Sequence, residues 1–459
     1  MPLTDSPAST QVWPGEWVER VLDVHLHSGS SADGAPLTSL VGLAVRRNPR
    51  RAHLLVSRVL GKHVPTDPDV VHDGGRRLGA LVAQALEAHR LTRLEGRPDR
   101  GRFVVLGYAE TATALGHIVA DVLDAPYLHS TRRRVEQVVP LGGFEESHSH
   151  AADHLLLPVD PQLLSALEGD GPLVLVDDEI STGSTALQTI AALQQTHPRA
   201  HYVLASLVDL RSLADRERMT AETASLGAAV DVVALATGSI DLPPDVLARG
   251  ERVVTAQESI CASPPPRGGL TGDVVRVVPR AAAWGPDVKE GGRHGFLPGD
   301  RAALEAAVTA LAGEVATACG PGRRVHVLGF EELMYAPLRL AQALALELAG
   351  PDGAVVTSST TTSSPILVVD DPGYPVRSAL TFPAHDDPAG GPATRYAYNI
   401  SAPASDPADR FDVVVLVVDA RGDRPELTAP GGLVPQLARA ADRVVLVVLP
   451  QHDPVGVPA

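Results

Sequence analysis

Short apolar runs alternate along the chain with longer segments whose apolar residues recur at helical spacing. Residues 104–106 form such a run, and residues 113–123 then carry apolar side chains at every third or fourth position. The alternation returns with the apolar runs at 173–176 and 201–208 and with the helical segment that begins at Ala186. Short buried runs predict strands, and strands separated by helices predict a parallel sheet with helices on its faces.

The pattern breaks between residues 261 and 300 and then returns. Two clusters rich in glycine and proline, at 263–269 and 291–295, are typical of loops that separate domains. Beyond them, the β-branched runs at 413–418 and 444–449 predict strands that are buried on both faces of a second parallel sheet. We therefore predict a flexible tail over residues 1–17, a first α/β domain over 18–260, a linker over 261–300 and a second α/β domain over 301–459.

The composition limits the classes of protein to which the chain can belong. Of its 459 residues, 44% are hydrophobic and 20% are charged, which is typical of globular domains with sizeable cores. The formal net charge of −16 disfavours a general nucleic-acid binder, because an acidic surface repels phosphate backbones. Cys261 and Cys319 lie too far apart for a metal-binding spacing, and we see neither a signal peptide nor an apolar run of membrane-spanning length. These features predict a cytoplasmic protein that binds neither nucleic acid nor membrane.

One segment combines two carboxylates with a loop of small polar residues. Asp177 and Asp178 follow the apolar run at 173–176, and a polar loop then enters the next predicted helix. The loop residues are Ser181, Thr182, Gly183, Ser184 and Thr185. Backbone N–H groups and hydroxyls at the start of a helix suit a phosphate, while an acidic pair suits a ribose diol or Mg²⁺. The segment therefore predicts a ribose 5-phosphate site at the carboxyl end of a strand, against the plainer alternative of a helix corner capped by Asp and Ser.

Residues 176–185 resemble the binding signature for 5-phosphoribosyl-1-pyrophosphate (PRPP) of type I phosphoribosyltransferases, in which two acidic residues precede a phosphate loop. The resemblance implies a second loop that holds the pyrophosphate of PRPP. Residues in the right order for that loop are Tyr108, Ala109, Glu110 and Thr111. Their backbone N–H groups would bind the pyrophosphate, and Glu110 would meet magnesium or a substrate hydroxyl. The alternative is a plain turn in which Thr111 caps the next helix.

A basic, polar segment follows the strand predicted at residues 127–129. Type I enzymes carry a mobile loop at this point, and the resemblance makes Arg132 and Arg133 the candidates for neutralising the departing pyrophosphate. An arginine run of this kind is equally typical of a solvated surface. His148, His150 and His154 have a spacing that suggests a metal site, but a polar lid over the active site is the favoured interpretation.

The chain also resembles a narrower subgroup, the phosphoribosyltransferases that are fused to a TRSP domain and occur in bacterial tellurium-resistance and stress-response gene clusters. Residues 40–65, 107–116 and 144–154 carry this resemblance in the first half, and residues 329–338 carry it in the second. It implies two Rossmann-like parallel-sheet domains, the first with the type I phosphoribosyltransferase fold. The naming motif Thr-Arg-Ser-Pro reads Thr-Ser-Ser-Pro at residues 362–365, so its arginine is absent.

Polar residues of the second half suggest a second site. Its candidates are Glu331, Glu332, Arg377, His385, Arg395, Asn399 and Asp419. Asp419 ends a predicted buried strand, where ligand-binding carboxylates are common, whereas Glu331 and Glu332 could instead cap a helix. If the motif arginine binds an anion, the chain either has lost this charge or supplies a substitute such as Arg377.

These features lead to three hypotheses. The first is an enzyme that ribosylates a nitrogen base with Mg-PRPP, releases pyrophosphate and makes a nucleoside-like metabolite. The second is a regulator that binds PRPP without turning it over, and the third is a non-catalytic scaffold of a stress gene cluster. The acidic surface disfavours a nucleic-acid-binding regulator, and the intact acidic pair and phosphate loop disfavour a scaffold. The acceptor base and the oligomeric state, a homodimer included, stay open.

Overall fold

Two open sheets form the framework of the protein in a computed structural model that describes residues 12–47, 51–92, 103–133, 135, 138, 140–144, 154–261, 272–350, 353–384, 394–450 and 452. The first sheet has the strand order β1-β10-β9-β8-β4-β5, and every strand pair except β1 with β10 is parallel. Its strands are β1 (His25–Ser31), β4 (Val104–Gly107), β5 (Tyr127–His129), β8 (Leu173–Ile180), β9 (His201–Asp209) and β10 (Ala229–Asp241).

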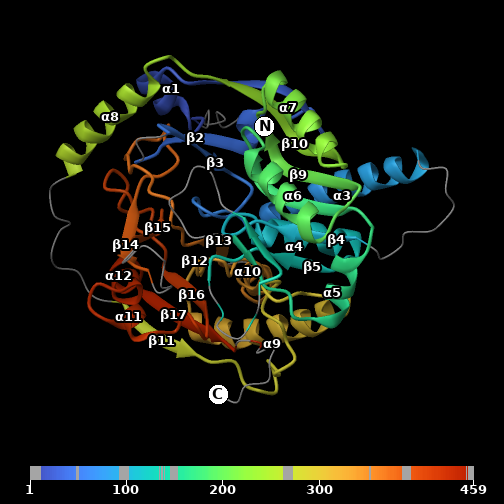
Figure 1. The fold of residues 1–459 in the computed structure, drawn as a ribbon. Coiled ribbons are helices and arrows are strands. Elements are labelled where there is room, and N and C mark those ends of the chain that lie inside the picture. The colour runs from blue at the N-terminus through green and yellow to red at the C-terminus, as the bar shows by residue number, and fades with distance from the viewer. Residues whose placement is uncertain are drawn as a thin grey trace, which may run out of the picture.

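The second sheet has the order β11-β17-β16-β12-β13 and is parallel throughout. Its strands are β11 (Asp273–Val277), β12 (Arg324–Gly329), β13 (Val355–Thr360), β16 (Val413–Asp419) and β17 (Arg443–Leu449). The prediction of an α/β protein with two parallel-type sheets is therefore confirmed. In Figure 1 the first sheet lies in the blue-to-green upper right of the molecule, and the second runs from the centre to the lower left in yellow to red.

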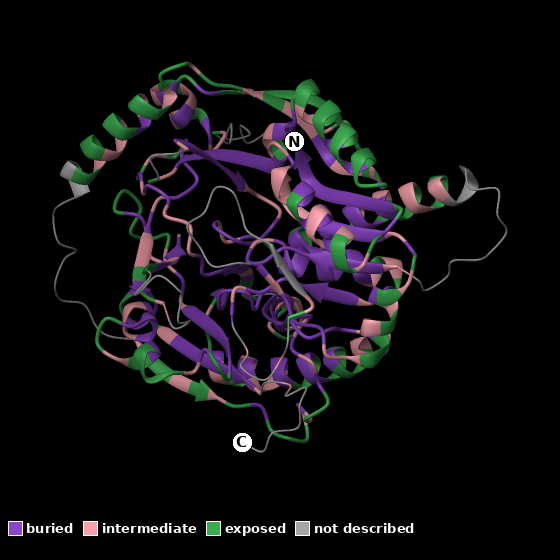
Figure 2. Ribbon diagram, viewed as in Figure 1, coloured by how far each residue is buried: buried purple, intermediate pink, exposed green. Residues whose placement is uncertain are grey.

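Helices cover both faces of each sheet. The helices are α1 (Glu16–Leu22), α2 (Leu37–Leu40), α3 (Pro68–Thr92), α4 (Thr113–Leu123), α5 (Pro161–Glu168), α6 (Ser184–Thr196), α7 (Leu213–Ser225), α8 (Val246–Cys261), α9 (Arg301–Cys319), α10 (Tyr335–Glu347), α11 (Pro425–Thr428) and α12 (Leu433–Ala440). Residues of α3, α4, α9 and α10 share one hydrophobic core with the facing sides of both sheets. The other face of the first sheet packs against α5, α6 and α7, and that of the second packs against α11 and α12. One hydrophobic core thus joins the two halves, and Figure 2 colours most of the strand ribbon in both sheets as buried.

Short antiparallel pairs complete the described structure. They are β2 (Val41–Val45) with β3 (His53–Ser57), β6 (Gly142–Phe144) with β7 (His154–Leu156), and β14 (Ala379–Pro383) with β15 (Thr394–Tyr398). The β2–β3 hairpin lies against the second half, because the backbone of Arg46 bridges to Ile366 and Leu367 N–H donates to Val45 O at 2.9 Å.

The predicted helix at residues 113–123 is confirmed, and the strand predicted at 173–176 is confirmed but too short. β8 continues to Ile180, which is paired with Asp209 of β9, so the acidic pair lies on the strand itself. The longer neighbour β9 supplies backbone hydrogen bonds beyond the apolar run. The hydrophobic pattern therefore predicted only residues 173–176, which are the buried start of the strand.

Described residues of the predicted linker and of the predicted tail contact the folded parts of the chain. Within 261–300, β11 joins the second sheet, and Phe296 exchanges two backbone hydrogen bonds of 2.8 Å with Tyr127 of the first domain. At the N-terminal side, Trp13 Nε1 donates to Val41 O at 2.9 Å. The glycine- and proline-rich cluster at 263–269 lies outside the described residues, and the cluster at 291–295 forms a bend directly before Phe296.

One helix of the described residues, over 298–319, is long and apolar enough to cross a membrane by length and composition alone. It contains α9, whose Leu304, Val308, Leu311 and Val315 lie in the core that the two sheets share. This burial explains the apolar character of α9 as that of a core-facing helix.

Candidate active site

Three polar loops leave the first sheet at one edge. In the parallel register, Gly107 at the end of β4 is paired with Val176 of β8 on one side and with His129 of β5 on the other. The residues after these positions begin at Tyr108, Asp177 and Ser130. The structure therefore brings together the predicted phosphate, pyrophosphate and arginine segments, at the carboxyl edge where α/β sheets usually bind ligands.

The loop between β8 and α6 is built for close approach to an anion. Gly183 has φ +79°, and Thr182 Oγ1 and Ser184 Oγ lie 2.9 Å apart. Among the described residues, no acceptor bonds the N–H groups of Ser181, Thr182 and Gly183. Three unused donors at the start of a 13-residue helix suit a phosphate group.

The acidic residues before this loop differ in their surroundings. Asp177 and Asp178 are half-buried, and Asp178 N–H donates to Asp177 Oδ1 at 2.9 Å. The next residue, Glu179, forms an ion pair with Arg51 at 3.1 Å, and burial raises its pKa. Glu179 therefore has its own partner in Arg51, and the half-buried aspartate pair precedes the phosphate-type loop directly.

The loop after β4 offers fewer N–H groups than the sequence suggested. Tyr108 N–H donates to Val176 O, and Ala109 N–H donates to Ser130 Oγ, both at 3.0 Å. Of the four predicted donors, only those of Glu110 and Thr111 have no acceptor among the described residues. The prediction that the N–H groups of Tyr108 and Ala109 bind pyrophosphate is therefore wrong, because both groups already donate to acceptors within the protein.

Glu110 is turned toward the second domain. Arg395 Nη1 donates to Glu110 Oε1 at 2.7 Å, and Ser363 Oγ lies 3.2 Å from both carboxylate oxygens. Burial alone would raise the pKa of Glu110, but the cations Arg395, Arg132 and Lys62 hold it well below its ordinary value. The carboxylate is thus ionised, and its oxygens are engaged by residues of the second domain.

Lys62 is a candidate that sequence reasoning missed. Its side chain is only 6% exposed, and it makes no hydrogen bond from Nζ to another described residue. Burial lowers its pKa, which the nearby carboxylates of Glu110 and Asp178 partly offset. A lysine in the sequence gives no sign of burial, so only the fold identifies this cation beside both halves of the candidate site.

Arg132 and Arg133, both predicted to neutralise pyrophosphate, have different surroundings in the structure. Arg133 is 9% exposed and donates to Glu331 Oε2 at 2.5 Å and to Asp419 Oδ2 at 2.7 Å. Arg132 donates its backbone N–H to Glu332 Oε1 at 2.7 Å, and its charge acts on Glu110. The guanidinium of Arg133 therefore serves the domain interface, and Arg132 is the arginine that remains near the pyrophosphate-type loop.

The segment after β5 and its predicted lid are only partly described. His154 lies on β7, and its Nδ1 is 2.9 Å from Ser130 Oγ. His148 and His150 fall outside the described residues. The lid therefore stays a prediction.

Most of the predicted second-site residues meet between the domains. Glu331 and Glu332 follow β12, and Asp419 ends β16. Arg293, which sequence reasoning assigned to the linker, lies 3.4 Å from both Glu332 and Asp419. Burial alone would raise the pKa of Asp419, but Arg133 and Arg293 lower it to about 2. The cluster is a buried network of carboxylates and guanidinium groups.

Two other second-site candidates, Arg377 and Asn399, lie apart from that network. Arg377 pairs with Asp370 at 2.7 Å near the surface, so it does not replace the missing arginine of the motif. Asn399 donates from Nδ2 to His63 O at 3.0 Å, which ties the second domain to the loop that carries Lys62. His385 falls outside the described residues.

A small cavity lies where α4 meets the second domain. It is lined by Thr113, His117, His129, Glu290, Gly291, Gly292, Arg293, Glu332, Leu333, Met334 and Tyr335. The ring of His117 stacks on Tyr335 with centroids 3.6 Å apart, and burial lowers the pKa of His117 to about 3. The cavity is a part of the interface, and none of its lining residues belongs to β8 or to the phosphate-type loop.

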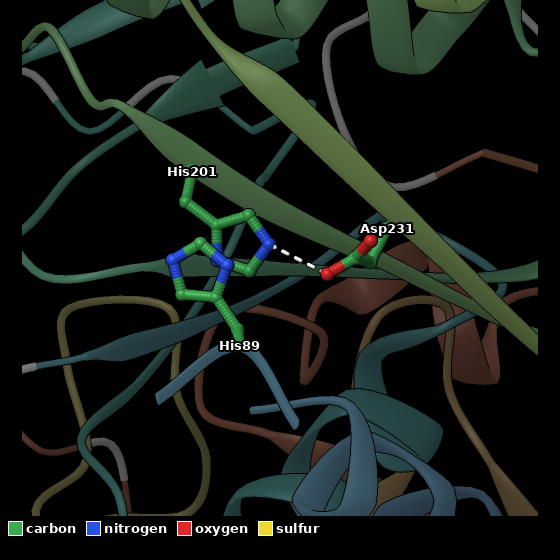
Figure 3. Close-up of side chains that lie close together, drawn as sticks. All are labelled: His89, His201 and Asp231. Carbon is green, nitrogen blue, oxygen red and sulfur yellow. Dashed lines mark hydrogen bonds and ion pairs between the residues drawn. The ribbon is translucent and has the colours of Figure 1, made fainter. Parts of the chain in front are cut away.

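A histidine–aspartate cluster lies at the other edge of the first sheet. His201 begins β9, Asp231 is in β10, and His89 is near the end of α3; their ligand atoms lie within 4.8 Å of one another (Figure 3). The two imidazole rings are stacked 3.5 Å apart with an angle of 3°, and His201 Nε2 lies 2.8 Å from Asp231 Oδ2. A metal ion takes the in-plane lone pair of each ring, and parallel planes do not meet, so this arrangement is not a formed metal site.

Comparison with known families matches both halves. Residues 40–239 match a family model described as phosphoribosyl transferase, and residues 290–437 match one described as the TRSP domain C-terminal to that family. The first range contains the acidic pair and both anion-type loops. The second contains the carboxylates of the interface. No curated protein matches the chain.

Solved phosphoribosyltransferases are similar to the chain over part of its length. An adenine phosphoribosyltransferase from Rhodothermus marinus is 19% identical over 43% of this chain and 94% of that chain, with a TM-score of 0.28. An orotate phosphoribosyltransferase from Aeropyrum pernix is 17% identical over 48% and 93%, with a TM-score of 0.24. The adenine enzyme from Trypanosoma brucei, solved with AMP, pyrophosphate and ribose-5-phosphate, is 14% identical over 36% of this chain, with a TM-score of 0.25. The match spans 64% of that enzyme, just under two thirds. TM-scores this low bear on neither the substrate nor the mechanism of this chain.

Proposed function

Because this chain belongs to a phosphoribosyltransferase family and carries that family's C-terminal TRSP domain, we propose that it transfers the 5-phosphoribosyl group of PRPP to a nitrogen base. The observation that carries the proposal is the meeting of three loops at one sheet edge: the acidic pair with its phosphate-type loop, the Glu110 loop and the Arg132 segment. Each loop supplies what one part of PRPP requires.

The ribose 5-phosphate end would bind at β8 and the loop behind it. The N–H groups of Ser181, Thr182 and Gly183, with the hydroxyls of Ser184 and Thr185, donate to the 5-phosphate. The carboxylates of Asp177 and Asp178 accept from the two ribose hydroxyls. Their oxygens also fit Mg²⁺, which prefers carboxylate and phosphate oxygens and, when bound with PRPP, would neutralise charge on the pyrophosphate.

The pyrophosphate end would bind at the neighbouring loop. The N–H groups of Glu110 and Thr111 donate to it, and the cations Lys62 and Arg132 offset its charge. The C1–O bond to pyrophosphate breaks, and the ring nitrogen of the base forms the C1–N bond on the opposite face. The base loses one proton, and the products are an N-ribosyl 5-phosphate and pyrophosphate.

The wider setting is also a proposal. We infer a cytoplasmic enzyme whose product is a nucleoside-like metabolite linked to stress response and tellurite resistance, on the basis of the subgroup that the sequence resembles. A strain that lacks the gene should then be more sensitive to tellurite than its parent, and unchanged sensitivity would count against this setting.

The first experiment is isothermal titration of Mg-PRPP into the full-length protein and into its Asp177→Asn/Asp178→Asn variant. We expect binding that the double variant abolishes, since it removes both negative charges and turns one acceptor oxygen of each side chain into an NH₂ donor, which suits neither the ribose diol nor Mg²⁺. A matched control is Asp231→Asn, at the opposite edge of the same sheet, which should bind PRPP like the wild type. Absence of binding by the wild type would reject the proposal.

A second measurement separates an enzyme from a regulator. A panel of nitrogen bases is added with Mg-PRPP, and pyrophosphate release is followed. We expect release with at least one base and none with the double variant. PRPP binding without release for every base would favour a regulator that senses PRPP.

A further inference from the structure

The second domain holds the carboxylate of the pyrophosphate-type loop. Arg395 comes from β15 and Ser363 from the segment after β13, and both bond Glu110, 285 and 253 residues away in sequence. The side chains of Arg395 and Glu110 are each 5% exposed. A buried ion pair of this kind has little freedom, so the position of Glu110 depends on the second domain.

In this geometry the carboxylate of Glu110 binds the second domain and not the substrate. Both of its oxygens accept hydrogen bonds, because Ser363 N–H also donates to Oε2 at 3.3 Å. A bare carboxylate in this loop would repel a pyrophosphate, whereas one neutralised by Arg395 does not. The N–H groups of Glu110 and Thr111 therefore remain as the donors of this loop for an anionic ligand.

The segment that carries Ser363 also bonds the β2–β3 hairpin of the first domain. Pro365 O accepts from Arg47 N–H at 2.9 Å, next to β2. The hydroxyl of Tyr398 donates to Ser364 O and accepts from Ile366 N–H, both at 2.7 Å. One rigidly bonded segment of the second domain therefore contacts both the β2–β3 hairpin and the pyrophosphate-type loop.

Arg395 supplies the positive charge that the motif lacks at position 363. Position 363 is a serine, and its hydroxyl lies 3.2 Å from Glu110, while Arg395 brings a guanidinium to the same carboxylate from a neighbouring strand. The charge is thus present although the motif residue is absent.

We propose that the TRSP domain is part of the pyrophosphate subsite: Arg395 and Ser363 are positioning residues that hold Glu110, so that the N–H groups of Glu110 and Thr111 point at the leaving pyrophosphate. The inference rests on the proposed function. It predicts that the second domain is required to bind pyrophosphate groups, while the ribose 5-phosphate end of PRPP is bound by the first domain alone.

The test measures three ligands on the full-length protein: Mg-PRPP, Mg-pyrophosphate and ribose 5-phosphate. Arg395→Gln should weaken PRPP and pyrophosphate binding by about 10- to 100-fold, the usual effect of losing a charge-assisted hydrogen bond, and leave ribose 5-phosphate binding unchanged. Arg395→Lys keeps the charge and should recover a good part of the affinity. The matched control is Arg377→Gln, which breaks an ion pair of the same domain near the surface and should change none of the three.

A variant that tests for simple unfolding is Glu110→Gln/Arg395→Gln, which removes both charges of the buried pair together instead of leaving one of them without the other. We expect its melting temperature to return toward that of the wild type while PRPP binding stays weak, because the loop is no longer held. If PRPP affinity returns to the wild-type value, Arg395 only neutralises Glu110 and the inference is wrong.

The remaining outcomes are equally decisive. Equal losses for PRPP, pyrophosphate and ribose 5-phosphate in Arg395→Gln would show general disruption and overturn the inference. Unchanged PRPP binding in Arg395→Gln would overturn it while leaving the proposed function intact. Failure of the wild type to bind PRPP would reject both.

Discussion

Gly183 lies where the phosphate-type loop enters α6, in a backbone conformation that other residues rarely adopt. Its φ is +79°, and a Cβ atom at this position would lie 2.2 Å from Met219 Cε. Met219 is fully buried, and Arg211 Nη1 donates to its sulfur at 3.0 Å. Both the backbone and the packing therefore require glycine here.

Replacement of Gly183 by alanine should cost more stability than the same change at a glycine with free space. Gly227 is the control, because it has φ +77° and a Cβ atom added to it would meet no other atom within 4 Å. Gly227→Ala should lose about 1–2 kcal/mol for the left-handed backbone alone, and Gly183→Ala a further 1–3 kcal/mol or so for overpacking Met219. Urea unfolding gives both values, and equal losses would contradict the packing argument.

At the scale of elements, the carboxyl ends of both sheets face the same region. The loops that follow β4, β5 and β8 come from one sheet, and those that follow β12, β13 and β16 come from the other. Glu110 and Arg133 of the first set bond Ser363, Glu331 and Asp419 of the second. Each sheet therefore contributes side chains to the carboxyl edge of the other, which is the edge where α/β sheets usually bind ligands.

The packing of helix α9 can be tested by the reactivity of its cysteine. Its last residue, Cys319, is 2% exposed, lies in the shared core, and has a pKa that burial raises to about 12. In a Cys261→Ser variant at pH 8, Cys319 should not react with a disulfide reagent until the protein unfolds, because about one thiol in 10⁴ is ionised. Rapid reaction in the native protein would show that α9 does not pack as described.

At the scale of the whole molecule, buried ion pairs join the domains. Arg133, Glu331 and Asp419 are each at most 9% exposed, and removal of the arginine leaves two buried carboxylates without their main partner. Arg133→Met should lower the free energy of unfolding by about 3–5 kcal/mol. The control, Arg276→Met, breaks an exposed pair with Asp423 and should cost less than about 1 kcal/mol. Similar losses for the two variants in urea unfolding would argue against a tightly packed interface.

Acid should destabilise the molecule through its buried histidines. Burial lowers the pKa of His53, His129 and His294 to about 4 and that of His117 and His326 to about 3. The unfolded chain, with a pKa near 6.5, takes up these protons first. The free energy of unfolding is therefore highest above pH 6.5 and falls as the pH drops from 6.5 toward 4.

His117 allows this dependence to be tested at one position. Its two ring nitrogens have no hydrogen-bond partner among the described residues, and the ring stacks between aromatic side chains. His117→Phe should keep the wild-type melting temperature at pH 7.5 and lose less stability between pH 6.5 and 5, by up to about 1.4 kcal/mol per pH unit. The exposed His27→Gln serves as control and should keep the wild-type slope. An unchanged slope in His117→Phe would contradict the argument.

The sequence by itself determined the local elements and the chemistry of the first site. Helix α4 matched its prediction residue for residue, and the acidic pair and phosphate-type loop were visible as a pattern. Side-chain periodicity, glycine and the polar start of a helix act over a few residues, so the sequence carries them directly.

Only the tertiary structure decided which charges meet. The bond between Glu110 and Arg395 spans 285 positions, Lys62 is buried where the charges of Glu110 and Asp178 act on it, and Arg133 bonds the second domain. These pairings depend on how two separately predicted sheets pack against each other. No local pattern encodes that packing, because burial of a charge becomes favourable only once its distant partner is in place.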